Sequence, residues 1–157
     1  HHRLDTPASG LMVLALHTSA NVALADGFRE GTISRTYRVC VVGDPGESGT
    51  WEEPLDEKPA RTHWRRMTTG GGMAVLDVTL DTGRTHQIRR HAVAAGHPVV
   101  GDRRHGGAAG RAWPRLALHA FRLSLHHPRS GEPVAFECPV PDDLTALFAR
   151  AGMPSAP

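Results

Sequence analysis

The fold is constrained most by three segments whose residues alternate between two faces. Two of these segments are joined by a glycine turn. Residues 33–42 alternate in this way, and the segments 61–67 and 73–80 flank Gly70-Gly71-Gly72. Alternation with a period of two is typical of β-strands, and a glycine-rich turn between two such segments predicts an antiparallel hairpin. We therefore expect an antiparallel sheet at the centre of the protein.

Other segments predict helices beside this sheet. Thr18 is the expected N-cap of a helix that runs to about residue 30, and Thr85 is that of a helix that runs to about residue 95. A third helix is expected at about residues 142–151. Further strands are expected at residues 10–16, 116–118, 121–125 and 134–137. The pattern predicts an α+β fold with a mixed, mainly antiparallel sheet and flanking helices.

Composition limits the possible classes of protein. A chain of 157 residues is long enough for one domain, 1–157, with a real core. The formal charge of +2 is mildly basic, and residues 43–60 form a loop rich in acidic residues, Gly and Pro that should repel RNA. Cys40 and Cys138 lie far apart, and the chain shows neither a signal peptide nor a membrane-length apolar run. Free thiols and a cytoplasmic location are expected.

The N-terminal stretch carries a carboxylate in a suggestive place. Asp5 ends the segment His2-Arg3-Leu4-Asp5, and a turn at residues 6–10 follows it. The apolar run 11–16 predicts a buried strand behind this turn, so Asp5 is expected at the mouth of that strand. A carboxylate anchored in this way can serve as a nucleophile, a base or a metal ligand, or it can simply cap the turn.

A second stretch carries a resemblance to a known family. Its motifs are Gly83-Arg84-Thr85-His86-Gln87-Ile88-Arg89-Arg90-His91, Gly96-His97-Pro98, Gly101-Asp102 and His105-Gly106. Together with residues 2–5 and the later segments 115–120, 127–128 and 131–133, they stand in the order found in the RluA family of RNA pseudouridine synthases. The chain resembles that family over nearly its whole length, and the resemblance implies the pseudouridine synthase catalytic fold.

The resemblance also implies roles for single residues. Asp5 would be the catalytic carboxylate, acting on the sugar or base of a uridine by covalent attack or by removing a proton. Arg89 would pair with Asp5, and Tyr37 would pack against the uracil. Residues expected to bind substrate or RNA are Arg3, Arg84, His86, Gln87 and Arg90. Because the isomerisation involves no redox change, no cofactor or metal is expected.

Departures from the family pattern narrow the expected substrate. Arg90 and His105 replace an apolar residue and a tyrosine, and residues 61–64 read Arg-Thr-His-Trp. These features resemble the tRNA pseudouridine synthase C branch. The expected partner is therefore RNA, with tRNA ahead of rRNA, and neither a membrane nor an obligate protein partner is expected.

Two alternatives from other classes remain open. In the resembling family, strands precede the segment matched by residues 2–5, so the sequence reads as an N-terminally truncated domain, less stable than a full-length protein. It could then bind RNA without turnover. The other alternative is a metal-dependent hydrolase that uses His1, His2, Asp5, His86 and His91. His86 and His91 are five residues apart, which suits a shared metal poorly.

Overall fold

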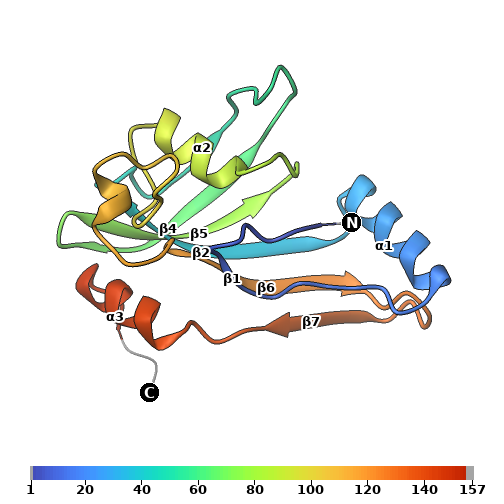
Figure 1. Cartoon of the computed structure of the whole chain (residues 1–157). Helices are drawn as coiled ribbons and strands as arrows, with labels where there is room; N and C mark the ends of the chain where they lie inside the picture. The colour runs from blue at the N-terminus through green and yellow to red at the C-terminus, as the bar shows by residue number, and fades with distance from the viewer. Residues whose placement is uncertain (1, 155–157) are drawn as a thin grey trace.

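A seven-stranded sheet forms the centre of the protein (Figure 1), and the computed structural model describes residues 2–154. The strands follow one another in space in the order β1-β6-β2-β5-β4-β3, and β7 also pairs with β6. Only β1 is parallel to its neighbour; every other pair is antiparallel. The predicted fold class is confirmed. The strands are β1 (Ser9–Gly10), β2 (Ser34–Val42), β3 (Ser48–Trp51), β4 (Thr62–Gly70), β5 (Met73–Leu80), β6 (Leu118–His126) and β7 (Pro133–Glu137).

Within the described residues, three α-helices pack around the sheet. Helices α2 (Gln87–Ala94) and α3 (Asp142–Arg150) lie on opposite sides of it, and α1 (Thr18–Glu30) lies near one end (Figure 1). A short 3₁₀ helix, η1 (Ala109–Arg111), follows α2. None of the helices in this part of the chain is long and apolar enough to span a membrane.

The main core lies where both faces of the sheet are covered. Val39, Cys40 and Val41 are consecutive in β2 and therefore point to alternate faces, yet all three are fully buried. Ile88 of α2 and Leu144 of α3 belong to the same apolar cluster. Burying a side chain of this size stabilises the fold by about 1.5–3 kcal/mol. Burial also raises the pKa of the Cys40 thiol to about 12, so Cys40 is an inert core residue.

A smaller apolar cluster holds α1 against the end of the sheet. Leu24 of α1 and Ile33 are buried together with Leu123 and Leu125 of β6. Phe28, one turn after Leu24, packs against the edge of this cluster. The cluster therefore fixes the C-terminal turn of α1 beside the N-terminal segment.

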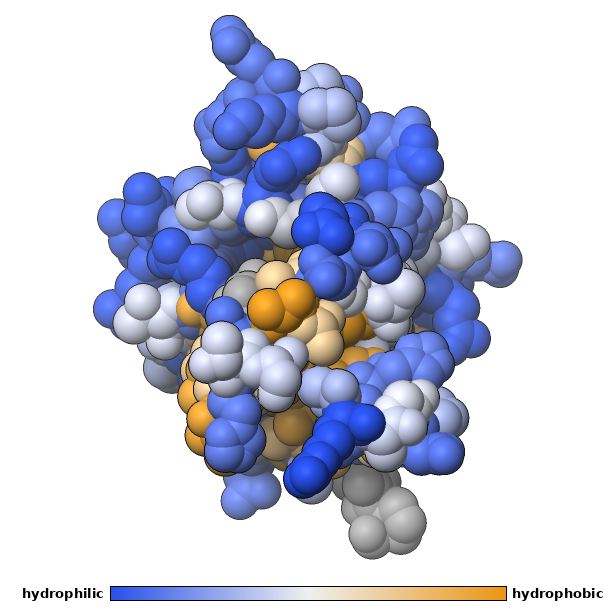
Figure 2. All heavy atoms as spheres, turned by 90° about the vertical axis from the view of Figure 1, so that its right-hand side faces the viewer, coloured by the Kyte–Doolittle hydropathy of each residue, from blue (hydrophilic) through white to orange (hydrophobic). Residues whose placement is uncertain are grey.

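The prediction of a buried strand at residues 10–16 is wrong. Strand β1 ends at Gly10, and Leu16 is 88% exposed. The reason is competition for β6, because β2 pairs with one edge of β6 and β7 pairs with residues 122–126 on the other. Residues 11–16 are left without a strand partner, and their apolar side chains alternate between partly buried and exposed positions. Figure 2 shows apolar surface at this end of the molecule.

Other boundaries also differ from the prediction. The acidic loop 43–60 contains β3, which pairs with β4. The strand predicted at 121–125 lies within β6, which begins at Leu118, so residues 116 and 117 of the other predicted segment precede the strand. His17, not Thr18, holds the N-cap position, because its carbonyl accepts the first helical hydrogen bond, from Asn21. Likewise His86, not Thr85, precedes α2, since the His86 carbonyl accepts from the Arg90 amide.

Candidate active site

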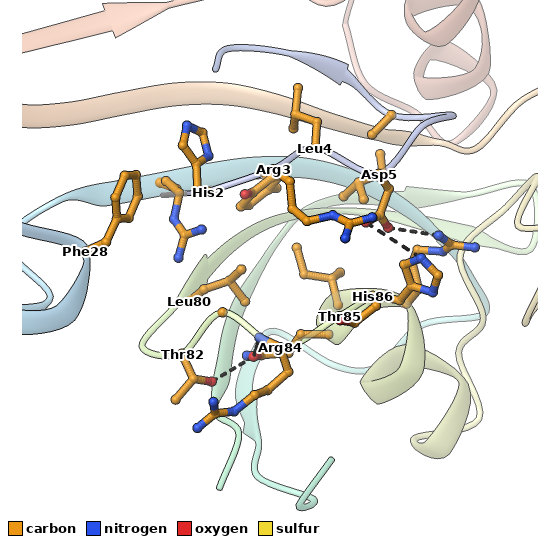
Figure 3. Close-up of a pocket in the computed structure, with 18 of the residues that line it drawn as sticks. His2, Arg3, Leu4, Asp5, Phe28, Leu80, Thr82, Arg84, Thr85 and His86 are labelled. Atoms are coloured by element: carbon orange, nitrogen blue, oxygen red, sulfur yellow. Dashed lines mark hydrogen bonds and ion pairs between the residues drawn. The ribbon is translucent and has the colours of Figure 1, made fainter. Parts of the chain in front are cut away.

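A cleft of about 580 Å³ opens beside Asp5 (Figure 3). Its walls are the N-terminal segment 2–8, the end of α1, the first half of β2 and the segment 80–89 that leads into α2. Elements that are distant in sequence thus meet around Asp5. The turn predicted after Asp5 is present, because the Ala8 amide donates to the Asp5 carbonyl at 2.8 Å.

Arg89 connects Asp5 to a second, fully buried carboxylate. Its Nη1 donates to Asp5 Oδ2 at 2.9 Å, while its Nε and Nη2 donate to the two oxygens of Asp102 at 2.8 and 2.7 Å. The predicted pairing of Arg89 with Asp5 is therefore confirmed. The bidentate contact to Asp102 fixes the plane of the guanidinium, so its remaining arm holds Asp5 in one orientation.

Asp102 serves this arrangement as an anion. Burial alone would raise its pKa, but hydrogen bonds from Arg89 and from the amides of Arg104 and His105 keep the pKa below its usual value. Arg89 resists deprotonation, because its pKa is raised despite burial by the hydrogen bonds to Asp102 and Asp5. The result is a buried cation shared by two carboxylates.

A pair of histidines lies next to the free oxygen of Asp5. His86 Nε2 is 4.0 Å from Asp5 Oδ1, and His86 Nδ1 is 2.9 Å from His105 Nε2. Burial lowers the pKa of both imidazoles, although Asp5 opposes the shift at His86 and Asp102 opposes it at His105. Both rings are therefore neutral near pH 7.

Tyr37 forms part of the cleft wall beyond Asp5. The residue is 6% exposed, and burial raises the pKa of its hydroxyl while Arg35 and its hydrogen bond oppose that shift. Arg35 also lies over the Phe28 ring, 5.2 Å from its centroid. Phe28 in turn lies against His2 at a ring separation of 4.8 Å, so this end of the cleft is aromatic and cationic (Figure 3).

The residues predicted to bind RNA are only partly brought together. Arg3, Arg84 and His86 line the cleft, and Arg3 is exposed there. Arg84 also donates from Nε to the Pro59 carbonyl at 3.0 Å. Arg90 does not line the cleft, because both arms of its guanidinium bind Asp56 on the surface.

Gln87, the fifth predicted RNA ligand, has structural partners. Its side-chain oxygen accepts from Thr82 Oγ1 and the Arg84 amide, and its nitrogen donates to the Arg61 carbonyl and Thr62 Oγ1. The residue is 3% exposed. Gln87 therefore joins the segment before α2 to β4, and it is one of the residues that line the cleft.

The histidines of the hydrolase alternative are not gathered at one place. His91 is buried between Thr62 Oγ1 and the Glu53 carbonyl, and His2 accepts from the Val13 amide. His1 lies outside the described residues. Across residues 2–154, no group of three or more His, Cys, Asp or Glu side chains is arranged to hold a metal ion. Cys40 and Cys138 are both free thiols.

Sequence reasoning gave no role to Asp102 or His105. Both lie in motifs that it noted, and an acidic residue two positions after the buried pair Val99-Val100 is a usable signal for a buried ion pair. What the sequence does not contain is the distance: Asp102 and Asp5 are 97 positions apart, and only the fold brings both to Arg89.

Comparison with known proteins agrees with this geometry. The sequence model of a family described as RNA pseudouridylate synthase matches residues 1–94. The chain belongs to the RNA pseudouridylate synthase family. Over 95% of its length it is 40% identical to an RNA pseudouridine synthase of Chloroflexus aurantiacus that is called uncharacterized. Over 94% it is 37% identical to the ribosomal large subunit pseudouridine synthase D of Nitrosomonas europaea.

These relatives are longer proteins, and solved structures share the fold. The chain covers 52% of the Chloroflexus protein and 49% of the Nitrosomonas protein, so it spans about half the length of these curated relatives. Human RNA pseudouridylate synthase domain containing 1 superposes with a TM-score of 0.76 at 29% identity, over 89% of this chain and 68% of the human one. Human RNA pseudouridylate synthase domain containing 4, at 20% identity and a TM-score of 0.79, shows the shared fold.

Proposed function

We propose that this protein isomerises a uridine in RNA to pseudouridine, with Asp5 as its catalytic carboxylate. The observation that carries the proposal is the Asp5 carboxylate itself: one oxygen is held by the buried Arg89, and the other faces a cleft that also contains Tyr37. Membership of the RNA pseudouridylate synthase family supports the same reaction.

The cleft provides what this reaction needs. A base must leave its stack to reach the Asp5 carboxylate, and the cost is a few kcal/mol. The Tyr37 ring offers an apolar surface for the extruded uracil, while Arg3 at the rim suits a phosphate. Covalent attack and proton removal both require the ionised carboxylate that Arg89 holds in place. Since the isomerisation transfers no electrons overall, the reaction calls for no redox cofactor.

For the RNA, we propose large-subunit rRNA as the first substrate to test. The curated relatives support it, because the one from Nitrosomonas europaea and one from Escherichia coli, 35% identical over 94% of the chain, are named ribosomal large subunit pseudouridine synthase D. The expectation of tRNA rests on Arg90, His105 and residues 61–64. Arg90 binds Asp56, and Thr62 and Trp64 are buried, so these residues have structural uses that do not depend on a tRNA.

We further propose that residues 1–157 act as part of a single catalytic domain. We also propose that this domain modifies RNA in the cytoplasm. The shared sheet and core support this unit, because β2 contacts β5 and β6 along its length and both faces of the sheet are covered. We assign it no obligate protein partner and no cofactor.

The substitution Asp5→Asn tests the catalytic assignment. It should lower pseudouridine formation by more than about 10³-fold, while RNA binding changes little, because the amide keeps the size of the carboxylate and loses its basicity. The measurement is pseudouridine yield on large-subunit rRNA and on bulk tRNA, with RNA binding followed in parallel. Asp142→Asn, an exposed change at the start of α3, is the matched control.

Each possible result of these measurements supports or contradicts one of the alternatives. Near-normal activity of Asp5→Asn would remove Asp5 from the mechanism. A wild-type chain that binds RNA without converting it would support the RNA-binding fragment. Conversion of tRNA but not rRNA would restore tRNA as the substrate.

A further inference from the structure

The proposed reaction assigns no role to the pair of histidines beside Asp5, His86 and His105. His105 Nε2 and His86 Nδ1 are hydrogen-bonded at 2.9 Å, which leaves His86 Nε2 facing the cleft and Asp5 Oδ1. No hydrogen bond to His86 Nε2 is seen from the described residues, and its 4.0 Å separation from Asp5 is too long for a direct hydrogen bond. An opening between two polar atoms therefore remains at the centre of the site.

The position of His86 is imposed by the surrounding structure. Its backbone has φ 53° and ψ 31°, the left-handed region that a non-glycine residue adopts only when its contacts demand it. The side chain is 13% exposed, and its ring meets that of His105 edge to face at 5.1 Å. The ring is thus fixed from the backbone side and from the His105 side.

Electrostatics determine which nitrogen of His86 carries the proton. A lone pair on Nε2 would face the Asp5 carboxylate and be repelled, whereas an N–H there is attracted. With the proton on Nε2, Nδ1 is an acceptor, and His105 Nε2–H is its donor. Burial is the main reason that the pKa of His86 lies below its usual value, so a second proton on the ring is disfavoured. The positive charges of Arg89 and Arg104 act in the same direction, and Asp5 opposes them.

We propose that His86 Nε2–H and Asp5 Oδ1 together bind the 2′-hydroxyl of the target nucleotide, and that His105 is the positioning residue that fixes the tautomer of His86. The inference rests on the proposed function and names the part of the substrate held at this point of the cleft. The hydroxyl accepts from His86 and donates to Asp5. An oxygen about 2.8 Å from each atom would see them at an angle of about 90°, which a hydroxyl can accommodate.

The 2′-hydroxyl is the group that fits this description within an RNA chain. The 3′ and 5′ oxygens of an internal nucleotide are esterified to phosphate and cannot donate a hydrogen bond. The 2′-hydroxyl both donates and accepts, and it is what distinguishes RNA from DNA at a given site. The same pair of protein atoms would therefore select against a deoxynucleotide.

The tautomer is tested first, without substrate. Long-range ¹H–¹⁵N spectra of the histidine rings should show the His86 proton on Nε2 with Nδ1 unprotonated near pH 7.5. His105→Phe, which removes the donor, should allow the other tautomer, and His105→Gln, which retains an N–H donor, should preserve the original. A His86 ring protonated on Nδ1 in the wild-type protein would overturn the role of His105.

The hydroxyl site is tested with uridine 5′-monophosphate and its 2′-deoxy counterpart as probes. The wild-type protein should bind the ribonucleotide at least about thirtyfold more tightly, as expected for one neutral and one charge-assisted hydrogen bond. His86→Asn, which tolerates the left-handed backbone, and His105→Phe should both lose this preference, while His105→Gln and the exposed control His126→Gln keep it.

Equal binding of the two nucleotides by the wild-type protein, or binding of neither up to about 10 mM, would overturn the 2′-hydroxyl site. Pseudouridine formation is not measured in these experiments. A protein that discriminates the nucleotides but never forms pseudouridine would contradict the proposed function and leave this site standing, so the two failures are distinguishable.

Discussion

At the scale of single residues, the site depends on one arginine that serves two carboxylates. Asp102 is fully buried and takes two of the three Arg89 hydrogen bonds, while Asp5 takes the third. A buried charge without its partner is strongly destabilising, so each member of this group depends on the others. Asp102 therefore influences the reaction through the orientation of Arg89 and Asp5.

The substitution Asp102→Asn should lower the free energy of unfolding by about 3–5 kcal/mol, because it removes one charge from a buried pair and leaves Arg89 under-compensated. The measurement is urea denaturation at pH 7.5. Asp56→Asn is the control: Asp56 is 68% exposed and pairs with Arg90, so its loss should cost less than about 1 kcal/mol. Equal effects of the two substitutions would contradict the buried-pair account.

The residues of the site show how far sequence can predict it. Asp5, Arg89, Tyr37 and His86 are brought to one cleft as the motifs indicated. Arg90 was expected to bind substrate or RNA, but it directly follows Arg89, and consecutive residues of a helix point about 100° apart. One arginine therefore enters the core and the next reaches Asp56 on the surface. Which of the two arginines enters the core could have been assigned from sequence only if the position of α2 on the sheet were known.

At the scale of elements, local sequence patterns predicted the positions of helices and strands well. They could not predict which strands would win the competition for a shared partner. The hairpin of β4 and β5, strand β2 and all three helices lie where alternation and capping placed them, within a few residues. The segment 10–16 failed because β7, more than 110 residues later, takes the edge of β6 that this segment would need. No property of residues 10–16 alone contains that information.

Gly10 marks the point where β1 leaves β6, and it tests the close approach of the two backbones. Its φ is +110°, and a Cβ would lie 2.3 Å from the Ala120 carbonyl oxygen. Gly10→Ala should therefore destabilise the protein by more than about 2 kcal/mol and displace Asp5, five residues earlier. Thermal melting and pseudouridine yield are the measurements.

Gly31→Ala provides the matched control for this prediction. Gly31 also has a positive φ, +73°, but nothing lies within 4 Å of its Cβ position. Its replacement should cost only about 1 kcal/mol of backbone strain, with the site undisturbed. If both glycines proved equally tolerant, the steric argument at Gly10 would fail.

At the scale of the whole molecule, the exposed apolar strip at residues 12–16 should govern association. Leu14 is 69% exposed and Leu16 is 88% exposed. The double substitution Leu14→Gln with Leu16→Gln should reduce self-association in light scattering and leave the free energy of unfolding within about 0.5 kcal/mol of wild type. Leu11→Gln should instead destabilise, since Leu11 packs against the α1 cluster. Unchanged association in the double variant would show that this surface is not adhesive.

The stability of the protein should depend on pH, because four histidines distributed over the whole fold have shifted pKa values. Burial lowers the pKa values of His2, His86, His105 and His119 below 6.5. The unfolded chain therefore binds more protons than the folded one as the pH falls below about 6.5. The stabilisation is fully present above that pH and is lost as the pH falls through the folded pKa values. Asp102, whose pKa is also lowered, adds a further loss below about pH 4.

The free energy of unfolding, measured by urea denaturation, should therefore decrease steadily from pH 7.5 to pH 5. His119 offers the clearest test, because it is fully buried and bonds Ser9 Oγ at 2.8 Å and the Cys138 carbonyl at 2.9 Å. His119→Gln should be less stable at pH 7.5 but should show a shallower decrease, because one proton-binding group is gone from the unfolded chain. A wild-type stability that stays constant or rises toward pH 5 would mean that these imidazoles are already charged in the folded protein, and the neutral pair His86 and His105 beside Asp5 would then have to be abandoned.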